Sequence, residues 1–227
     1  MRLLPLIVLV CCCSAHAQDS TIIIKAGTSI NESVSATDLY EYPQFVYGKV
    51  FFRANDSSGG RLNYNRFADQ MQFIDFKGDT LNIAYPGTVR FIRINNDLFY
   101  YDNGYVKLIK DNNTIKLAAK QTLIVSGKNK IGAYGMASPG SAIDSYGSFN
   151  IDNKNYKLTP KVDITLAKKT QYYFGDKYNH FVLANKKNLL SLYSKQEGTV
   201  AAYLKENKVD FNNREDLEKL LQYLTDL

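Results

Sequence analysis

The residues best suited to covalent or metal chemistry are scarce in this sequence of 227 residues, which has three Cys, two His and no Trp. All three Cys lie within the first 13 residues, and His16 follows closely. A zinc site of the Cys and His type needs about four such ligands, so the rest of the chain has too few. One histidine is enough for a Ser-His-Asp arrangement, which makes His180 a candidate general base. The candidate serines, Ser138 and Ser141, lie in a Gly-rich stretch without a Gly-x-Ser-x-Gly motif.

A second arrangement with catalytic potential is a pair of carboxylates in one predicted turn. Asp75 and Asp79 flank Phe76-Lys77-Gly78, and a hairpin there would bring the two side chains close together. Two carboxylates about 5–9 Å apart support glycoside hydrolysis. Acidic residues beside a glycine are also ordinary turn formers, because their side chains bond the backbone of the turn. A secreted hydrolase that uses His180 or this pair is therefore the alternative hypothesis.

Motifs for cofactors and nucleotides are absent from the sequence. It has no phosphate-binding loop, no dinucleotide-binding glycine pattern and no His-Glu-x-x-His motif. The spacing of its aspartates also differs from that of a calcium-binding loop. We therefore predict neither a cofactor nor a metal site.

The most distinctive charge pattern is a lysine-rich block between residues 105 and 161, where nine Lys accompany three Asp. Clustered cations attract anions in a salt-dependent way. Lysine also protects exposed strands from aggregation, so a purely structural explanation stays open. The ligand-binding site predicted from this block comprises Tyr105, Lys107, Lys110, Lys116, Lys120, Lys128, Lys130 and Tyr134.

Residues 1–17 have the features of a secretory signal peptide. Arg2 supplies a positive start, residues 3–13 are apolar, and Ala15-His16-Ala17 is a small-x-small cleavage site. No stretch reaches the ~18 apolar residues of a membrane-spanning helix, so we expect no transmembrane segment after cleavage. A chain exported without disulfides is typical of the periplasm or cell surface of a Gram-negative bacterium. Lipid anchoring at the cysteines of residues 11–13 is the alternative to cleavage after Ala17.

Residues 44–184 predict a β-rich domain that follows an N-terminal extension, residues 18–43. Short apolar or aromatic runs alternate there with turns rich in Gly, Asn and Asp, which is typical of antiparallel hairpins. We predict an α+β fold with an antiparallel β meander, arranged as a sandwich or a partly closed barrel. Residues 126–149, rich in Gly and Ser, are expected to form a long flexible loop. The expected strands are residues 45–52, 62–64, 71–76, 81–84, 89–94, 98–101, 105–109, 115–118, 156–158, 162–166, 171–174 and 180–183.

Residues 185–227 predict three short helices packed on the sheet. Leucines at positions 217, 220, 221 and 224 have the spacing of one apolar helix face. Ser194 with Glu197 is expected to form a capping box, and Asn212 with Glu215 a similar cap for the last helix. A face that binds a partner helix remains open as an alternative to core packing.

Two parts of the sequence resemble a family of uncharacterised exported proteins of Gram-negative bacteria. The first lies within residues 60–82 and includes Met71-Gln72-Phe73-Ile74-Asp75 and Gly78-Asp79-Thr80-Leu81. The second runs from Lys186-Lys187-Asn188-Leu189-Leu190, through Tyr203-Leu204-Lys205-Glu206-Asn207-Lys208, to Glu215-Asp216-Leu217. The resemblance implies a β-rich envelope protein with C-terminal helices, and it brings no catalytic residue.

The leading hypothesis is a non-catalytic envelope protein that binds a macromolecular or anionic surface partner. The expected partners are an envelope protein, a glycan or an anionic lipid surface. Nucleic acid is not expected, because the predicted compartment holds little of it. A purely structural role in an envelope assembly agrees with the same features.

Overall fold

The computed structural model describes residues 21–131, 137–139, 159–225 and 227. Its strands are β1 (Ile22–Ile24), β2 (Val46–Phe52), β3 (Ser57–Asn65), β4 (Gln70–Ile74), β5 (Thr80–Asn82), β6 (Val89–Ile94), β7 (Asp97–Tyr101), β8 (Tyr105–Asp111), β9 (Lys116–Ile131), β10 (Ala137–Pro139), β11 (Asp163–Gly175) and β12 (Phe181–Leu183). The helices are α1 (Ile30–Ser33), α2 (Ala36–Leu39), α3 (Lys186–Leu192), α4 (Glu197–Asn207) and α5 (Arg214–Thr225), with short 3-10 turns η1 (Pro86–Thr88) and η2 (Ser194–Gln196).

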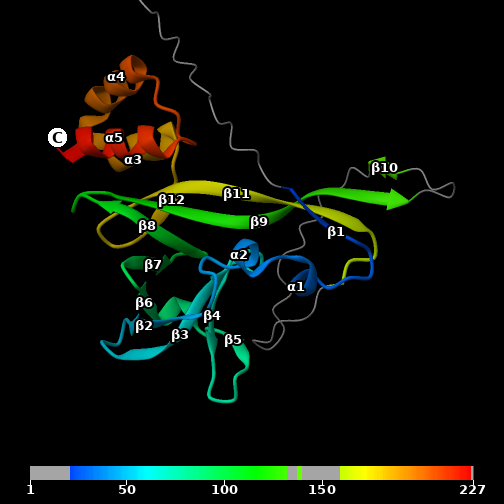
Figure 1. Ribbon diagram of the computed structural model, residues 1–227. Helices are drawn as coiled ribbons and strands as arrows, with labels where there is room; N and C mark the ends of the chain where they lie inside the picture. Colours follow the sequence, from blue (N-terminus) through cyan, green and yellow to red (C-terminus); the bar gives the residue numbers. More distant parts are fainter. Residues whose placement is uncertain (1–20, 132–136, 140–158, 226) are drawn as a thin grey trace, which may run out of the picture.

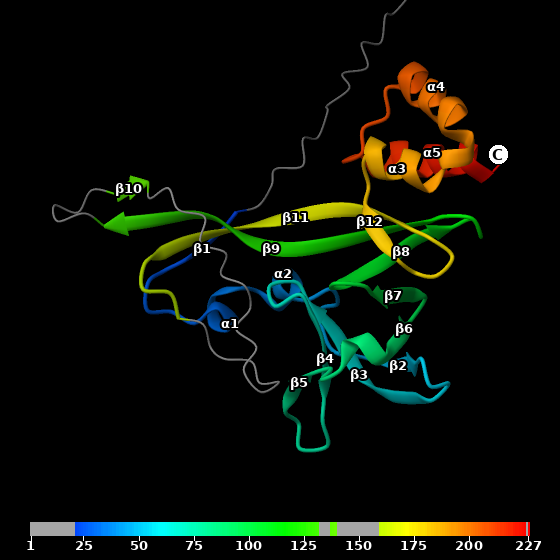
Figure 2. The same ribbon diagram turned by 180° about the vertical axis from the view of Figure 1, so that it is seen from behind.

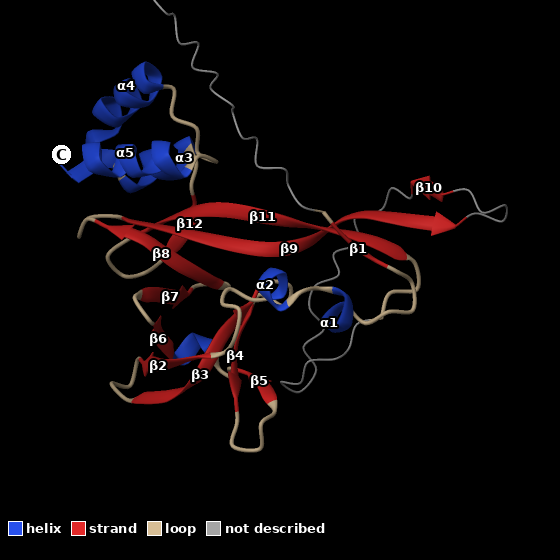
Figure 3. Ribbon diagram, in the orientation of Figure 1, coloured by secondary structure: helices blue, strands red, loops and turns tan. Residues whose placement is uncertain are grey.

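All the described strands belong to one antiparallel sheet that is not closed into a barrel (Figure 1). Its neighbours follow the order β1-β11-β9-β8-β7-β6-β2-β3-β4-β5, with β10 added to β9 and β12 added to β11. The predicted α+β class and the β meander are confirmed. Figure 3 shows the strands in red and the helices in blue, with α1 and α2 on one side of β9 and β11 and α3, α4 and α5 on the other.

Tight turns between the central strands depend on residues with a positive φ. Asn95 (φ 53°) joins β6 to β7, and Asn103 (φ 52°) with Gly104 (φ 122°) joins β7 to β8. Asn and Gly tolerate this left-handed region, which suits the twist of two-residue hairpins. The connection between the expected strands 45–52 and 62–64 is shorter than expected, because β3 already begins at Ser57 and its two glycines pair with β2.

The longest strands, β9 and β11, form a ribbon to which both groups of helices attach. Figure 2 shows α3, α4 and α5 on one side of this ribbon and α1 and α2 on the other. Alternate residues of a strand lie on one face. On one face of β9, Leu117 packs with α3–α5, whereas Leu123 packs in the cluster that includes residues of α1 and α2. Twist along the ribbon turns this single face toward both helical groups.

The boundary of the expected loop also differs in the structure. Residues 126–149 were expected to form a loop, but β9 continues to Ile131 and β10 covers Ala137–Pro139. Cross-strand pairing extends β9, because Gly127 and Lys128 lie opposite Thr165 and Ile164 of β11. The remaining residues of the expected loop, and the expected strand at residues 156–158, lie outside the described residues.

Three helices end the chain, as predicted, and the four leucines of α5 are all buried against the cluster that contains Leu117. Both predicted caps are wrong. η2 occupies Ser194–Gln196, and the side chain before α4 makes no capping bond. At α5 the amide of Asp216 donates to the side chain of Asn213, so the cap lies one residue later than expected. No helix in the described part of the chain is long and apolar enough to span a membrane.

Candidate functional site

A cavity of about 250 Å³ lies on one face of the sheet, between the C-terminal helices and a cluster of buried strand residues that includes Ile92, Phe99 and Tyr105. We call this cluster the main core. Ala119 and Gln121 of β9 line it, and they are the residues between Leu117 and Leu123 on the same face. The C-terminal helices cover the face at Leu117, and the cluster that contains residues of α1 and α2 covers it at Leu123. Neither group covers the stretch between these two leucines. We call the cavity at this place the central cavity.

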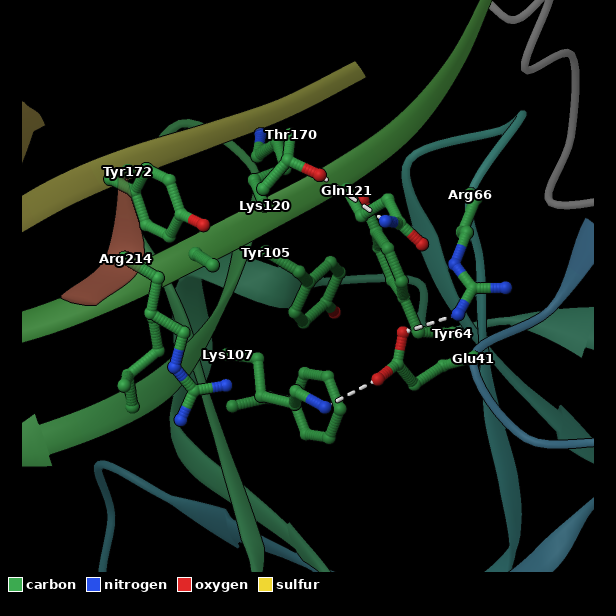
Figure 4. Close-up of a pocket in the computed structure, with 13 residues that line it drawn as sticks. Glu41, Tyr64, Arg66, Tyr105, Lys107, Lys120, Gln121, Thr170, Tyr172 and Arg214 are labelled. Atoms are coloured by element: carbon green, nitrogen blue, oxygen red, sulfur yellow. Dashed lines mark hydrogen bonds and ion pairs between the residues drawn. The ribbon is translucent and has the colours of Figure 1, made fainter. Parts of the chain in front are cut away.

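Glu41 lies in the wall of the central cavity between two cations. Its Oε2 accepts a hydrogen bond from Nη2 of Arg66 at 2.8 Å, and its Oε1 accepts one from Nζ of Lys107. Lys107 also lies 3.6 Å from a carboxylate oxygen of Asp97. Figure 4 shows the two bonds of Glu41 as dashed lines. Because both its oxygens accept bonds from cations, Glu41 serves here as a structural anion.

Arg66 fastens the end of α2 to the sheet. Its Nη1 donates to the backbone carbonyls of Thr37, Asp38 and Tyr40. The last carbonyls of a helix have no partner within the helix, and these three share the two N–H groups of Arg66 Nη1. The segment that carries Glu41 is therefore held at the edge of the cavity by backbone contacts as well as by charge.

Lys120 and Tyr64 meet at a second carboxylate beside the cavity. Nζ of Lys120 donates to Oδ2 of Asp69 at 2.8 Å, and the hydroxyl of Tyr64 donates to Oδ1 at 2.8 Å. Burial, reinforced by the charge of Asp69, raises the pKa of Tyr64 above its usual value. The ammonium of Lys120 fits because Gly104 has no side chain: a Cβ on Gly104 would lie 2.1 Å from Nζ.

Two buried polar groups of the lining have no hydrogen-bond partner among the described residues. They are the hydroxyl of Tyr105, whose residue is 1% exposed, and Nε of Arg66, whose residue is 8% exposed. Burial raises the pKa of Tyr105, so its hydroxyl keeps its proton at neutral pH. An unpaired buried donor costs about 1–3 kcal/mol, which an acceptor brought within hydrogen-bond distance would recover.

The remaining wall comes from β11 and the start of α5. Figure 4 shows Tyr172 and Arg214 on one side, Glu41 and Arg66 on the other, and Tyr105 between them. Arg214 is the first residue of α5, and its Nε donates to Glu218 at 2.7 Å while its side chain remains 61% exposed. The lining thus has four cationic side chains, from Arg66, Lys107, Lys120 and Arg214, and one carboxylate.

The lysine-rich block predicted from the sequence is divided by the fold. Tyr105, Lys107 and Lys120 meet at the central cavity. Lys116 is buried elsewhere, 3.6 Å from Asp111, and Lys110 is half-buried outside this lining. Lys107, Lys116 and Lys120 each pair with a carboxylate, so they do not form the open cationic surface that was expected.

The rest of the predicted ligand-binding site lies farther along the chain. Lys128 of β9 is half-buried opposite Ile164. Lys130 belongs to β9 and pairs with Ser138, but its side chain is not among those described, and the whole of Tyr134 lies outside the described residues. The structure therefore describes no contact between these residues and the central cavity.

Among the described residues, the catalytic candidates of the sequence are not assembled into a reactive group. His180 is exposed, and its Nδ1 lies 3.9 Å from Asp102. Oδ1 of Asp75 accepts bonds from the backbone amides of Lys77 and Asp79, so it closes the β4–β5 turn. Ser141 lies outside the described residues, and Ser138 belongs to β10. Across the described ranges, no group of three or more His, Cys, Asp or Glu side chains is arranged to hold a metal ion.

Sequence reasoning missed most of the cavity lining, including Glu41, Arg66, Tyr172 and Arg214. Glu41 and Arg66 lie in connections between elements, and Arg214 is the first residue of α5. Two weak signals were present in the sequence. Arg66 is a lone Arg between two expected strands, and the pair Tyr172-Tyr173 places a polar aromatic side chain on each face of a strand. Nothing local indicates that these residues meet.

Comparisons with protein-family models, with curated proteins and with solved structures found no match to this chain. Its function is therefore inferred from the cavity and from the charged groups around it.

Proposed function

We propose that this protein is an exported, non-catalytic binding protein of the Gram-negative envelope, and that its central cavity receives a small carboxylate-bearing group such as one acidic sugar. The observation that carries the proposal is the pair of unpartnered buried donors, the Tyr105 hydroxyl and Arg66 Nε, in the lining of one cavity. A carboxylate with neighbouring hydroxyls offers acceptors to both donors.

The charge and size of the cavity support an anion of this kind. The four cations of the lining each pair with a carboxylate, so they support an anion through N–H donors that these pairs leave over, and charge-assisted hydrogen bonds are about twice as strong as neutral ones. Pockets for drug-sized ligands measure about 300–1,000 Å³, so a cavity of about 250 Å³ suits a single sugar residue. Tyr172 adds an aromatic ring with a polar tip, a combination suited to sugar.

Binding without turnover is supported by the state of the carboxylates. Hydrolysis of a glycoside usually needs two carboxyl groups, one of them available to give a proton. Glu41 is the single carboxylate of the lining, and cations hold both its oxygens. Asp69, next to the lining, is similarly occupied by Lys120 and Tyr64.

The envelope location rests on residues 1–17, which lie outside the described residues. Expression in a Gram-negative host and mass spectrometry of the exported chain test it. Cleavage after Ala17 predicts a chain that begins at Gln18, whereas lipid anchoring predicts a modified cysteine. An unprocessed chain that stays in the cytoplasm would contradict the envelope location.

The ligand is tested by titrating the parent protein and Tyr105→Phe with glucuronate, with glucose as the uncharged probe. The substitution removes one unpartnered hydroxyl, so it should weaken glucuronate binding about fivefold, the effect of about 1 kcal/mol. Tyr193→Phe is the matched control, because the Tyr193 hydroxyl is also buried and unpartnered but lies outside this cavity.

Three results would contradict the proposal. One is equal binding of glucose and glucuronate by the parent protein. Another is an equal effect of Tyr105→Phe and Tyr193→Phe. The third is chemical conversion of a glucuronide by the parent protein, which would restore the hydrolase hypothesis.

A further inference from the structure

Four exposed cations of strands β2, β3 and β6 have no ion pair within the described residues: Lys49, Arg61, Arg90 and Arg93. They contrast with Lys107, Lys116 and Lys120, which all pair with carboxylates. The four lie in residues 44–104, outside the lysine-rich block of the sequence. Their grouping comes from strand pairing.

The register places three of these cations on one face. Lys49 of β2 lies directly opposite Arg93 of β6, and Arg61 of β3 lies opposite Tyr47 of β2. Tyr47 and Lys49 are two residues apart, so the side chains of all four residues share a face. The opposite face of the same strands carries Val50 and Ile92, which are buried in the main core. We call Tyr47, Lys49, Arg61 and Arg93 the outer-face site.

The tip of an aromatic ring lies over Gly59 among these charges. A Cβ built on Gly59 would meet the Tyr47 hydroxyl oxygen at 2.4 Å and its Cζ at 3.0 Å, so the ring lies across Gly59. Tyr47 is nevertheless 73% exposed. The missing side chain of Gly59 thus leaves an open aromatic surface with cations on either side. Such a ring suits stacking against a sugar, since its face is apolar and its tip is polar.

A second aromatic group extends the site along the same strands. Phe51 and Phe91 are cross-strand partners, and their ring centroids are 4.5 Å apart in a stacked arrangement. Lys49 Nζ lies 5.3 Å from the Phe51 centroid, and Arg90 lies 5.2 Å from that of Phe91. These cation–π contacts hold the cationic groups over the rings at exposed positions.

The pairing of Lys49 with Arg93 is unfavourable for the isolated sheet. Like charges directly opposite each other on neighbouring strands destabilise the pairing. No described carboxylate lies within 4.0 Å of either cation, so an anion from outside the chain is the complementary group. The cations come from three neighbouring strands about 4.8 Å apart, so a ligand with repeated charges reaches all three, whereas one carboxylate does not.

We infer that the outer-face site binds an acidic polysaccharide whose chain lies across β6, β2 and β3. The arginines hold carboxylates through two parallel hydrogen bonds, and Tyr47 stacks against a sugar ring. This inference does not rest on the central cavity, because the two sites share no residue and lie on opposite faces of the sheet.

Retention on immobilised polygalacturonate tests the inference, with neutral dextran as the uncharged polymer. The full chain with Lys49→Gln and Arg93→Gln together should bind polygalacturonate at least roughly tenfold more weakly. The matched control is Lys77→Gln with Lys177→Gln. Both lysines are exposed and lie over aromatic rings, and the two substitutions remove the same amount of charge. Tyr47→Ala should also weaken retention while leaving net charge unchanged.

The results distinguish the outer-face site from net charge, from a membrane surface and from the central cavity. Equal losses in the two double variants would overturn the inference, because binding would then follow net charge alone. Binding to anionic phosphatidylglycerol vesicles with no retention on polygalacturonate would also overturn it in favour of a membrane surface. Tyr105→Phe should leave retention unchanged, since a long polymer has few ends to enter the central cavity. A loss with Tyr105→Phe alone would assign the binding to the cavity.

Discussion

Arg66 and Glu41 form an ion pair at 2.8 Å that joins the end of α2 to the wall of the central cavity. The two side chains are only 9% and 14% exposed. Because both side chains are shielded from water, the pair carries a desolvation penalty. Its Coulomb attraction and the extra bonds of Arg66 to helix carbonyls offset this penalty. The same guanidinium leaves Nε without a partner among the described residues beside the cavity. The pair therefore couples folding of the N-terminal segment to the shape of the candidate site.

Replacing Glu41 with Gln should lower the free energy of unfolding by about 2–4 kcal/mol, because it leaves Arg66 buried without its charge partner. Urea unfolding measures the change. Glu218→Gln is the control, since it breaks the exposed helix pair with Arg214 and should cost about 0.5 kcal/mol or less. Equal costs for the two variants would show that burial does not strengthen the Arg66 pair.

Gly104→Ala should be more destabilising than Gly78→Ala, although both glycines have a positive φ of 122° and 90°. At Gly78 a Cβ meets nothing within 4 Å, so backbone strain of about 1 kcal/mol is the main cost. At Gly104 the new atom also displaces Lys120 from Asp69, and we expect about 2–4 kcal/mol in total. Urea midpoints that fall equally would contradict the packing around Lys120.

Arg93→Glu should raise the free energy of unfolding by about 0.2–1 kcal/mol while it weakens polygalacturonate binding. The substitution replaces a like-charge pair with an opposite-charge pair, because Lys49 lies directly across the strands. Arg90→Glu is the control, since Arg90 is not paired with a cation in the β2–β6 register. A fall in stability with Arg93→Glu would show that Arg93 makes a favourable contact in the parent protein.

Alkaline pH should destabilise the protein through its buried tyrosines. Burial raises the pKa of Tyr64 and Tyr105 above the value near 10 of the unfolded chain. The unfolded state therefore loses these protons first, so their contribution is complete below pH 10 and is lost as the pH rises above it. Between pH 10 and 11 the unfolding free energy of Tyr105→Phe should therefore fall less steeply than that of the parent protein. The difference in slope should be up to about 1.4 kcal/mol per pH unit.

Urea unfolding of the parent and of Tyr105→Phe from pH 7 to pH 11 checks this slope. Between pH 7 and 8, where neither state ionises its tyrosines, the difference between the two proteins should stay constant. Parallel curves over the whole range would mean that Tyr105 is not buried in the folded protein. Tyrosinate absorbance is free of tryptophan interference, because the chain has no Trp.

Much of the secondary structure was predictable because its signals are local. Tight turns such as Asn103-Gly104 require residues that accept a positive φ, and these stand out in the sequence. The leucines of α5 repeat at helical spacing, and all four are buried as expected. A local signal can also mislead: Ser194 and Glu197 match a capping box, but Ser194–Gln196 form a 3-10 turn.

The sequence by itself determined most of the central strands and their turns, the three C-terminal helices, and that reactive Cys and His chemistry is scarce. Only the tertiary structure decided which charges meet. Glu41, Lys107 and Arg214 reach one cavity from distant parts of the chain, and Lys49 reaches Arg93 through strand register. Register depends on long-range pairing and on which face is buried, so a count of charges along the chain carries no record of it.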